Sequence, residues 1–335
     1  MAKTGLKEAA YWEALDKGRV RCLLCPHGCV LGSDGIGLCR VRQNVGGTLR
    51  SLNYSRVSAV HWDPIEKKPL FHFYPGSPIL SLGTVGCNLA CAFCQNWTIS
   101  QATAGTRRLS PEEALEIARS DPNNLGIAYT YNEPFIWFEY VQETAALVKD
   151  AGMKNVLVTN GYVNEAPLRE LLPLVDAMNV DIKAMSNDFY RELCRGRSEP
   201  PRRTVEIAWA AGCLVEVTNL VIPNWNDSEE QIRAFVDWAA GVDVNLPVHF
   251  SRYHPDYKLT EPPTPPHVLM RAREIALEKL RFVYVGNLPG SVGEDTVCPS
   301  CGKVVVERQG FEVRRVCVKG GRCQFCGGEV PIRGT

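Results

Sequence analysis

Three cysteines in one short loop constrain this chain more than any other feature. Cys87, Cys91 and Cys94 have the spacing C-x3-C-x2-C and directly follow the apolar stretch 79–85. Thiolates bind iron–sulfur clusters, and a cubane held by four protein ligands has no free coordination position. A cubane held by three leaves one iron free to bind another molecule, as the open position of a catalytic zinc does. The spacing therefore predicts a catalytic metal site.

The same run resembles the signature of the radical S-adenosylmethionine (SAM) enzymes, because an aromatic residue, Phe93, precedes the last cysteine. The resemblance implies a 4Fe-4S cluster on the catalytic residues Cys87, Cys91 and Cys94, with SAM on the open iron. One electron, from a flavodoxin or ferredoxin, would split SAM into methionine and a 5′-deoxyadenosyl radical that takes hydrogen from a substrate. Phe93 is expected near the adenine. Three buried or zinc-binding cysteines are the alternative.

Composition excludes few classes of protein. The chain has 335 residues, of which 45% are hydrophobic, enough for one large domain with small appendages. Its formal net charge is zero, so the overall charge favours neither nucleic acid nor an anionic membrane. Residues 1–8 lack an apolar core of signal-peptide length, and no later segment is apolar over a membrane-spanning length. We therefore expect a cytoplasmic protein without a membrane partner.

The cysteine spacing supports the same compartment. There are 14 cysteines, and most of them cluster in C-x2-C and C-x3-C spacings. A secreted disulfide framework is typical of short exported chains, whereas these spacings in a large chain favour metal ligation in a reducing compartment.

Short apolar runs alternate with helical patterns between residues 79 and 286, which predicts βα units around a parallel sheet. Helix starts are signalled by the capping box at Ser110 and a similar run at Ser228. The units are too few for a closed eight-stranded barrel, so we expect an α/β fold with the partial (β/α)6-type barrel usual among radical SAM enzymes. The expected strands are 79–85, 126–131, 155–159, 178–182, 214–222, 247–252 and 282–285.

Small Cys-rich lobes are expected on both sides of this barrel. The predicted units are an N-terminal Cys-rich segment (1–75), the radical SAM partial barrel (76–290) and a zinc-ribbon-like C-terminal lobe (291–335). In βα barrels the chemistry gathers at the carboxyl ends of the strands, so polar motifs should follow successive strands.

The second expected strand is followed by Tyr131, Asn132, Glu133 and Pro134. This run occupies the position of the Gly-Gly-Glu-Pro-like turn that holds the SAM ammonium group in radical SAM proteins. It departs from that pattern by having Tyr and Asn where glycines are common. The resemblance implies a cofactor-binding role, while a helix-dipole role of Glu133 is the alternative.

The third and fourth strands end in Thr159-Asn160 and in Asp181-Ile182-Lys183. Both runs resemble motifs of the branch that activates glycyl-radical enzymes, where they line the SAM pocket and the Asp helps to bind a monovalent cation. Strand alternation puts Asp181 and Lys183 on one face, where Lys183 can neutralise the carboxylate of SAM. An internal salt bridge between them is the alternative.

Polar and aromatic residues also follow the later strands. The run 221–228 either caps the next helix or contacts SAM. Arg252, Tyr253 and His254 follow the sixth strand and are our candidates for substrate contacts, since polar groups at a barrel mouth often carry function.

Two outer groups of cysteines predict closed metal sites. Two C-x2-C pairs at the spacing of a zinc ribbon are formed by Cys298, Cys301, Cys323 and Cys326. An auxiliary cluster is the alternative to zinc. Cys317, between the pairs, is not expected to be a ligand. Near the N-terminus, four sulfurs lie on Gly- and Pro-shaped loops, and the sequence does not decide between zinc and a cluster there. These four are Cys22, Cys25, Cys29 and Cys39.

Taken together, these runs and the segment 63–76 resemble the AmmeMemoRadiSam-system radical SAM enzymes, relatives of pyruvate formate-lyase activating enzyme. The resemblance implies Memo-like and AMMECR-like partner proteins. The polar mouth lacks a long positive run, so we expect a peptide or protein substrate rather than nucleic acid. A small-molecule or nucleic-acid substrate is one alternative. The other is a non-enzymatic metal-binding module, in which Cys194 or Cys213 supplies a fourth ligand.

Overall fold

The computed structural model describes residues 6–288, 290 and 293–335. No signal peptide was expected at the N-terminus from the sequence. Residues 1–5 of that segment lie outside the described residues. So does residue 291, at which the C-terminal lobe was expected to begin.

One large curved sheet forms the centre of the molecule. Its strand order is β16-β15-β14-β13-β12-β11-β9-β8, and all neighbouring strands pair in parallel except β8 and β9. Each of the seven predicted strands is present. Their bounds are β9 (Pro78–Gly83), β11 (Gly126–Tyr129), β12 (Lys154–Thr159), β13 (Ala177–Asp181), β14 (Leu214–Val221), β15 (Val248–Arg252) and β16 (Val283–Gly286).

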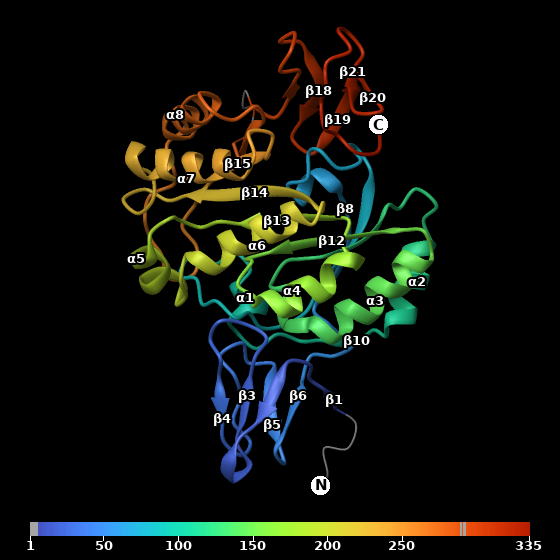
Figure 1. Ribbon diagram of the computed structural model, residues 1–335, viewed down its shortest axis with the longest axis vertical. Helices are drawn as coiled ribbons and strands as arrows, with labels where there is room; N and C mark the ends of the chain where they lie inside the picture. Colours follow the sequence, from blue (N-terminus) through green and yellow to red (C-terminus); the bar gives the residue numbers. More distant parts are fainter. Residues whose placement is uncertain (1–5, 289, 291–292) are drawn as a thin grey trace.

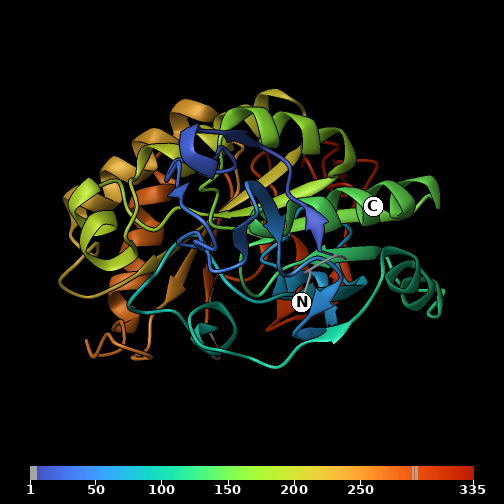
Figure 2. The ribbon, with the colours of Figure 1, turned by 90° about the horizontal axis from the view of Figure 1, so that it is seen from below.

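Helices cover one side of this sheet, as an arc in Figure 2. The capping box at Ser110 begins α2, and the Ser228 side chain accepts from the backbone of Gln231 at the start of α7, as predicted. Among the described helices, none is long and apolar enough to cross a membrane. The helices are α1 (Trp97–Ser100), α2 (Pro111–Arg119), α3 (Phe138–Asp150), α4 (Glu165–Leu171), α5 (Asn187–Phe189), α6 (Glu199–Ala210), α7 (Glu229–Val242) and α8 (Pro266–Leu277).

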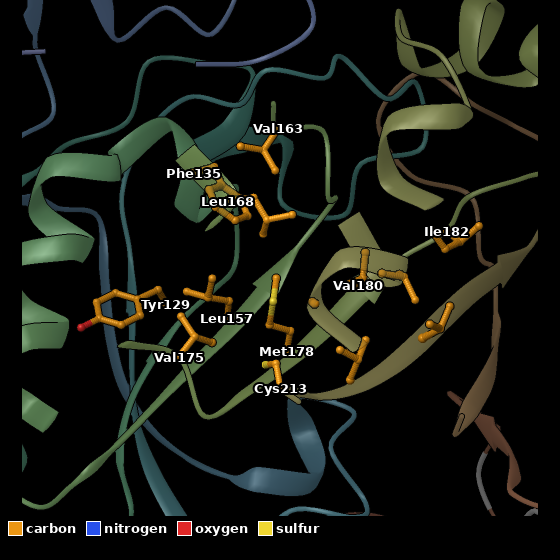
Figure 3. Packing of buried hydrophobic residues seen from close by; sticks show 14 of the residues in the cluster. Tyr129, Phe135, Leu157, Val163, Leu168, Val175, Met178, Val180, Ile182 and Cys213 are labelled. Carbon is orange, nitrogen blue, oxygen red and sulfur yellow. The ribbon is translucent and has the colours of Figure 1, made fainter. Parts of the chain in front are cut away.

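The core between the sheet and the helices is continuous and apolar. Figure 3 shows Leu157 of β12 and Met178 of β13 among side chains that include Leu168 of α4. Cys213, just before β14, lies in the same core. Parallel strands are covered on both faces, which explains why they read as nearly continuous apolar runs.

An eighth strand, β8 (Ala59–Pro64), was not predicted from the sequence. It pairs antiparallel with β9 and is followed by a 3-10 turn, Ile65–Lys67. Its Asp63 pairs with Ile79 at the start of β9, and the charged run 66–68 follows it.

Two small lobes lie at opposite ends of the central body (Figure 1). The N-terminal lobe consists of short antiparallel strands: β1 (Lys7–Glu8), β2 (Trp12–Ala14), β3 (Val20–Cys22), β4 (Val30–Leu31), β5 (Arg42–Val45) and β6 (Thr48–Ser51). β7 (Arg56–Val57) then pairs with β10 (Arg107–Arg108). The C-terminal lobe contains β17 (Thr296–Val297), β18 (Val304–Gln309), β19 (Glu312–Val316), β20 (Val318–Lys319) and β21 (Arg322–Cys323).

A buried polar network joins the C-terminal lobe to the amino ends of the parallel strands. Glu216 of β14 accepts from His249 Nε2 of β15 at 2.6 Å and from the backbone N of His72 at 2.7 Å. His72 Nε2 lies 2.7 Å from the hydroxyl of Tyr284, which in turn contacts Thr296 of the lobe at 2.9 Å. The C-terminal lobe therefore closes the end of the sheet opposite to the strand ends expected to hold the site.

Candidate active site

A cavity of about 520 Å³ lies at the carboxyl ends of the parallel strands. Successive strands contribute to its wall, with Thr130 after β11, Thr159 of β12, Asp181 of β13 and Ser251 of β15. Its volume is within the range of sites that bind small molecules and cofactors. Ten of the predicted site residues line it: Cys87, Cys91, Phe93, Cys94, Tyr131, Asn132, Thr159, Asn160, Asp181 and Lys183.

The three cysteines of the loop after β9 all face this cavity. Cys87 Sγ accepts from the backbone N of Leu89 at 3.4 Å and from Asn160 Nδ2 at 3.5 Å, and Cys94 Sγ lies 3.1 Å from Ser100 Oγ. Three sulfurs on one wall with donors directed at them fit a cluster held by three thiolates, since hydrogen bonds to sulfur stabilise such ligands.

Cys194 also reaches the triad. It is fully buried and packs in the same cluster as Cys91 and Phe93, and the backbone N of Ala90 donates to the carbonyl of Cys194 at 2.9 Å. A hydrogen bond from the Cys194 thiol lowers the pKa of Cys91, against the effect of burial. Cys213, in the core near β14, is not brought to the site.

Tyr131 and Asn132 hold the turn after β11 against its neighbours. Asn132 Nδ2 donates to the carbonyl of Gly86 at 2.7 Å, and its Oδ1 accepts from the backbone N of Thr84 at 3.2 Å. The Tyr131 hydroxyl donates to Asp63 of β8. Asn132 therefore fixes the start of the cysteine loop, Tyr131 joins the turn to β8, and both residues line the cavity.

Glu133 lies behind the wall and is fully buried. Its Oε1 accepts from Phe135 N at 3.0 Å and from Thr159 Oγ1 at 2.7 Å, and its Oε2 accepts from Asn160 N at 2.8 Å. Burial raises the pKa of Glu133 to about 7, although these donors favour the carboxylate. Glu133 thus joins the ends of β11 and β12, and its contact to SAM remains a prediction.

Asp181 and Lys183 form an ion pair at the cavity wall, with Lys183 Nζ 2.8 Å from Asp181 Oδ2. Burial disfavours the charge on Lys183, but Asp181 and then Cys91 raise its pKa above the usual value. Lys183 Nζ also lies 5.8 Å from the centre of the Phe93 ring. The wall therefore presents a cation beside the triad, in a position to attract a carboxylate.

Three residues that sequence reasoning missed lie at the opposite edge. Lys67 and Lys68 line the cavity and pair with Asp63 at 2.8 and 2.6 Å. Burial opposes ionisation of Asp63, but hydrogen bonds from Lys67, Lys68 and Tyr131 hold its pKa below the usual value. The sequence signal for these residues was the charged run at and after the end of β8. This run can be interpreted only once β8 is known to belong to the central sheet.

The three proposed substrate residues do not line the cavity. Tyr253 is fully buried and its hydroxyl donates to the carbonyl of Leu259, while Arg252 Nε donates to the carbonyl of Thr264 at 2.8 Å. His254 is exposed and lies 3.4 Å from Gln95, a residue of the cavity wall.

The segment that follows these three residues supports the cysteine loop. Tyr257 stacks on Trp97, and the backbone N atoms of Lys258 and Leu259 donate to the carbonyl of Ala92. The polar run after β15 therefore contributes to the shape of the site.

The four C-terminal cysteines meet in one place, with Cys298 and Cys326 sulfurs 3.7 Å apart and Cys301 and Cys323 sulfurs 3.8 Å apart. A tetrahedral zinc site has sulfurs about 3.8 Å apart, because each Zn–S bond is about 2.3 Å long. Of the described residues, only this group brings three or more potential ligand atoms within 4.8 Å of one another. Cys317 lies outside it.

Comparison with known proteins agrees with this geometry. Residues 81–236 match the model of the radical SAM superfamily. The matched segment begins in β9 and includes the triad and the strand ends that line the cavity. This chain contains a radical SAM domain. It is therefore a radical SAM enzyme, whose family chemistry requires a 4Fe-4S cluster and SAM.

Relatives span the radical SAM region and beyond. The protein MJ0808 of Methanocaldococcus jannaschii is 43% identical over 335 aligned residues, which cover 98% of this chain and 99% of that protein. The pyruvate formate-lyase-activating enzyme of Clostridium pasteurianum is 25% identical over 50% of this chain and 72% of its own length. The structure of Streptococcus suis SuiB bound to S-adenosylmethionine shares the fold, with a TM-score of 0.51, 14% identity and coverage of 68% of this chain and 53% of SuiB.

Proposed function

We propose that this radical SAM enzyme acts on a peptide or protein, with formation of a glycyl radical on a partner protein as one version. The observation that carries the proposal is sequence similarity to an enzyme named for activating pyruvate formate-lyase. The similarity covers 50% of this chain. The likeness extends to sequence motifs, because Thr159-Asn160 and Asp181-x-Lys183 resemble those of that branch.

The chain's own residues have separate parts in this proposal. Cys87, Cys91 and Cys94 would hold the 4Fe-4S cluster, which would supply the electron that cleaves SAM. Lys183 attracts the carboxylate of SAM, and Phe93 offers an apolar face to its adenine. Asn160 and Asn132 keep the wall in place through their bonds to Cys87 and Gly86. A monovalent cation at Asp181 stays a prediction, since that carboxylate is paired with Lys183.

The form of the cavity supports a large substrate. The cavity opens to solvent at the strand ends and is not enclosed. An open mouth admits a chain segment, whereas small substrates are usually buried over most of their surface. Lys67 on the wall favours a segment with a carboxylate or another polar group beside the reacting C–H bond.

Several finer predictions belong to the same proposal. We propose that the C-terminal cysteines hold zinc. We also propose that the chain consists of an N-terminal Cys-rich segment (1–75), the radical SAM partial barrel (76–290) and the C-terminal lobe (291–335). The AmmeMemoRadiSam subfamily and its Memo-like and AMMECR-like partners, a flavodoxin or ferredoxin as donor, and a cytoplasmic location remain predictions from the sequence.

The substrate class can be tested with fractions of the source organism's lysate. The anaerobically reduced enzyme is incubated with SAM and each fraction, and 5′-deoxyadenosine is measured. We expect protein fractions to stimulate its formation, and protease treatment of those fractions to abolish the stimulation. The triple Cys→Ala variant of the triad is the control for nonenzymatic SAM breakdown. Stimulation by the small-molecule or RNA fractions alone would contradict the proposal.

A further inference from the structure

Four N-terminal cysteines line a small cavity of their own, separate from the active site. Cys22 and Cys39 are buried, and Cys25 and Cys29 are half-buried. They come from β3, the loop after it and the Gly-rich loop before β5. None of the four forms a disulfide, so all four thiols are free to bind a shared ligand.

The spacing of these sulfurs differs from that of the C-terminal group. In this part of the described chain, no three of the N-terminal sulfurs all lie within 4.8 Å of one another, and the triad sulfurs also exceed that limit. A single zinc ion draws four sulfurs together, as at Cys298 and Cys326. A cubane places four irons between its ligands and needs them farther apart. The N-terminal group, like the triad, therefore lacks the close sulfur spacing of the zinc-like group.

Arg42 supplies a second observation. It lines the same cavity and is 1% exposed, and its ion pair with Glu139 (2.5 Å) and its bond to the Ala10 carbonyl (2.7 Å) use its two terminal nitrogens. Its Nε has no hydrogen-bond partner among the described residues. A buried donor without a partner is costly, and the sulfides of a cluster would supply an acceptor.

The N-terminal group is joined to the triad loop on both sides of Cys87. Before it, a Cβ on Gly86 would lie 2.4 Å from the carbonyl oxygen of Cys39, so only glycine fits there. After it, His27 Nε2 lies 2.7 Å from the carbonyl of Asn88. Cys25 also packs against the apolar cluster that contains Cys91. The zinc-like lobe, by contrast, lies at the far end of the molecule (Figure 1).

We propose that Cys22, Cys25, Cys29 and Cys39 hold a second 4Fe-4S cluster, which passes the reducing electron to the triad cluster. This role rests on the triad being the site of SAM cleavage. A one-electron protein donor is oxidised while the N-terminal cluster goes from the 2+ to the 1+ state. That cluster returns to 2+ as the triad cluster is reduced by the same electron.

Metal identity is tested without reference to activity, on the full chain with Cys87→Ala, Cys91→Ala and Cys94→Ala. After anaerobic reconstitution we expect about four irons and one zinc in this variant, against about eight irons and one zinc in the wild type. Its reduced EPR signal should not respond to SAM. Iron-free protein with about two zincs would overturn the proposal, whatever the enzyme's substrate.

The relay is tested with Cys25→Ala/Cys29→Ala, and Cys317→Ser is the matched control. SAM cleavage driven by reduced flavodoxin should fall at least tenfold in the double variant. Cleavage driven by dithionite, which reaches the open cavity directly, should stay within about twofold. Equal rates with flavodoxin in the double variant and the control would overturn the relay.

If the double variant does not fold, the wild type provides the test. Full reduction should give an EPR spectrum broadened by coupling between two neighbouring clusters. A spectrum equal to the sum of two isolated clusters would contradict the relay.

Discussion

Cys194 packs in the same buried cluster as Cys91, and its thiol lowers the pKa of this triad ligand. The π-helical turn Tyr190–Cys194 brings it there, and the Ala92 backbone N donates to the carbonyl of Leu193 at 2.8 Å. Single π turns inside helical segments are frequent at functional sites. A fourth cysteine beside the triad raises the question of whether the site is open or closed.

We predict that Cys194→Ala keeps the triad cluster and its response to SAM, because Cys194 acts as a donor to Cys91 and not as a ligand. Loss of this donor should lower the cluster's reduction potential, since hydrogen bonds to ligand sulfur raise it. Iron content and a potentiometric EPR titration check this, with Cys213→Ala as the buried-cysteine control. Loss of triad iron in Cys194→Ala alone would identify a closed, non-catalytic site.

The sequence predicts the strands and the cysteine triad of this site better than the long-range contacts that hold them in place. The seven parallel strands are recognisable because they are buried on both faces, and the triad because its ligands lie within one loop. The contact between Cys194 and Cys91, and that between Asp63 and Tyr131, join segments distant in the chain. No local pattern encodes such contacts.

Predictions made from polarity alone also missed the contacts that some residues form. Tyr253 was expected at the barrel mouth, but its ring is fully buried and its hydroxyl finds a backbone carbonyl. The expected contact of Glu133 to SAM stays a prediction, and in the structure both of its oxygens accept bonds from the neighbouring strand end. A polar side chain at a strand end can form hydrogen bonds either to a ligand or to other groups of the protein. Only the fold distinguishes these cases.

Asp181→Ala and Lys183→Ala should each weaken SAM binding by roughly ten- to a hundredfold, the effect of losing a charge-assisted bond. Iron bound by the triad should not change, because neither residue is a ligand. Equilibrium binding of SAM to the reconstituted protein measures this. The exposed pair Asp237 and Lys279 provides matched Ala controls. Unchanged SAM affinity in both variants would mean that the pair is only a salt bridge.

The C-terminal lobe should lose its fold when its metal site is broken. Structural zinc contributes on the order of 10 kcal/mol in small domains of this type. We predict zinc after removal of iron from the wild type, and rapid proteolysis beyond about residue 290 in Cys298→Ser. Cys317→Ser, outside the group of four, should resist the protease as the wild type does. Iron retained by this lobe would contradict the zinc assignment.

Stability should fall as the pH drops from about 6.5 to about 4. Burial lowers the pKa of His72 to about 4, so the unfolded chain binds a proton in this range that the folded chain does not. The loss is on the order of 3 kcal/mol. Urea unfolding of His72→Gln should show a shallower pH dependence, while the exposed control His267→Gln should keep that of the wild type. Parallel curves for all three proteins would contradict this origin.

The most direct test of the account compares the wild type with the triple variant Cys87→Ala, Cys91→Ala, Cys94→Ala under anaerobic reduction. We predict that the wild type forms 5′-deoxyadenosine and that SAM changes the EPR spectrum of its reduced cluster. The variant should do neither, while its zinc content stays that of the wild type. Formation of 5′-deoxyadenosine by the variant at the wild-type rate would contradict the central claim that these three cysteines hold the catalytic cluster.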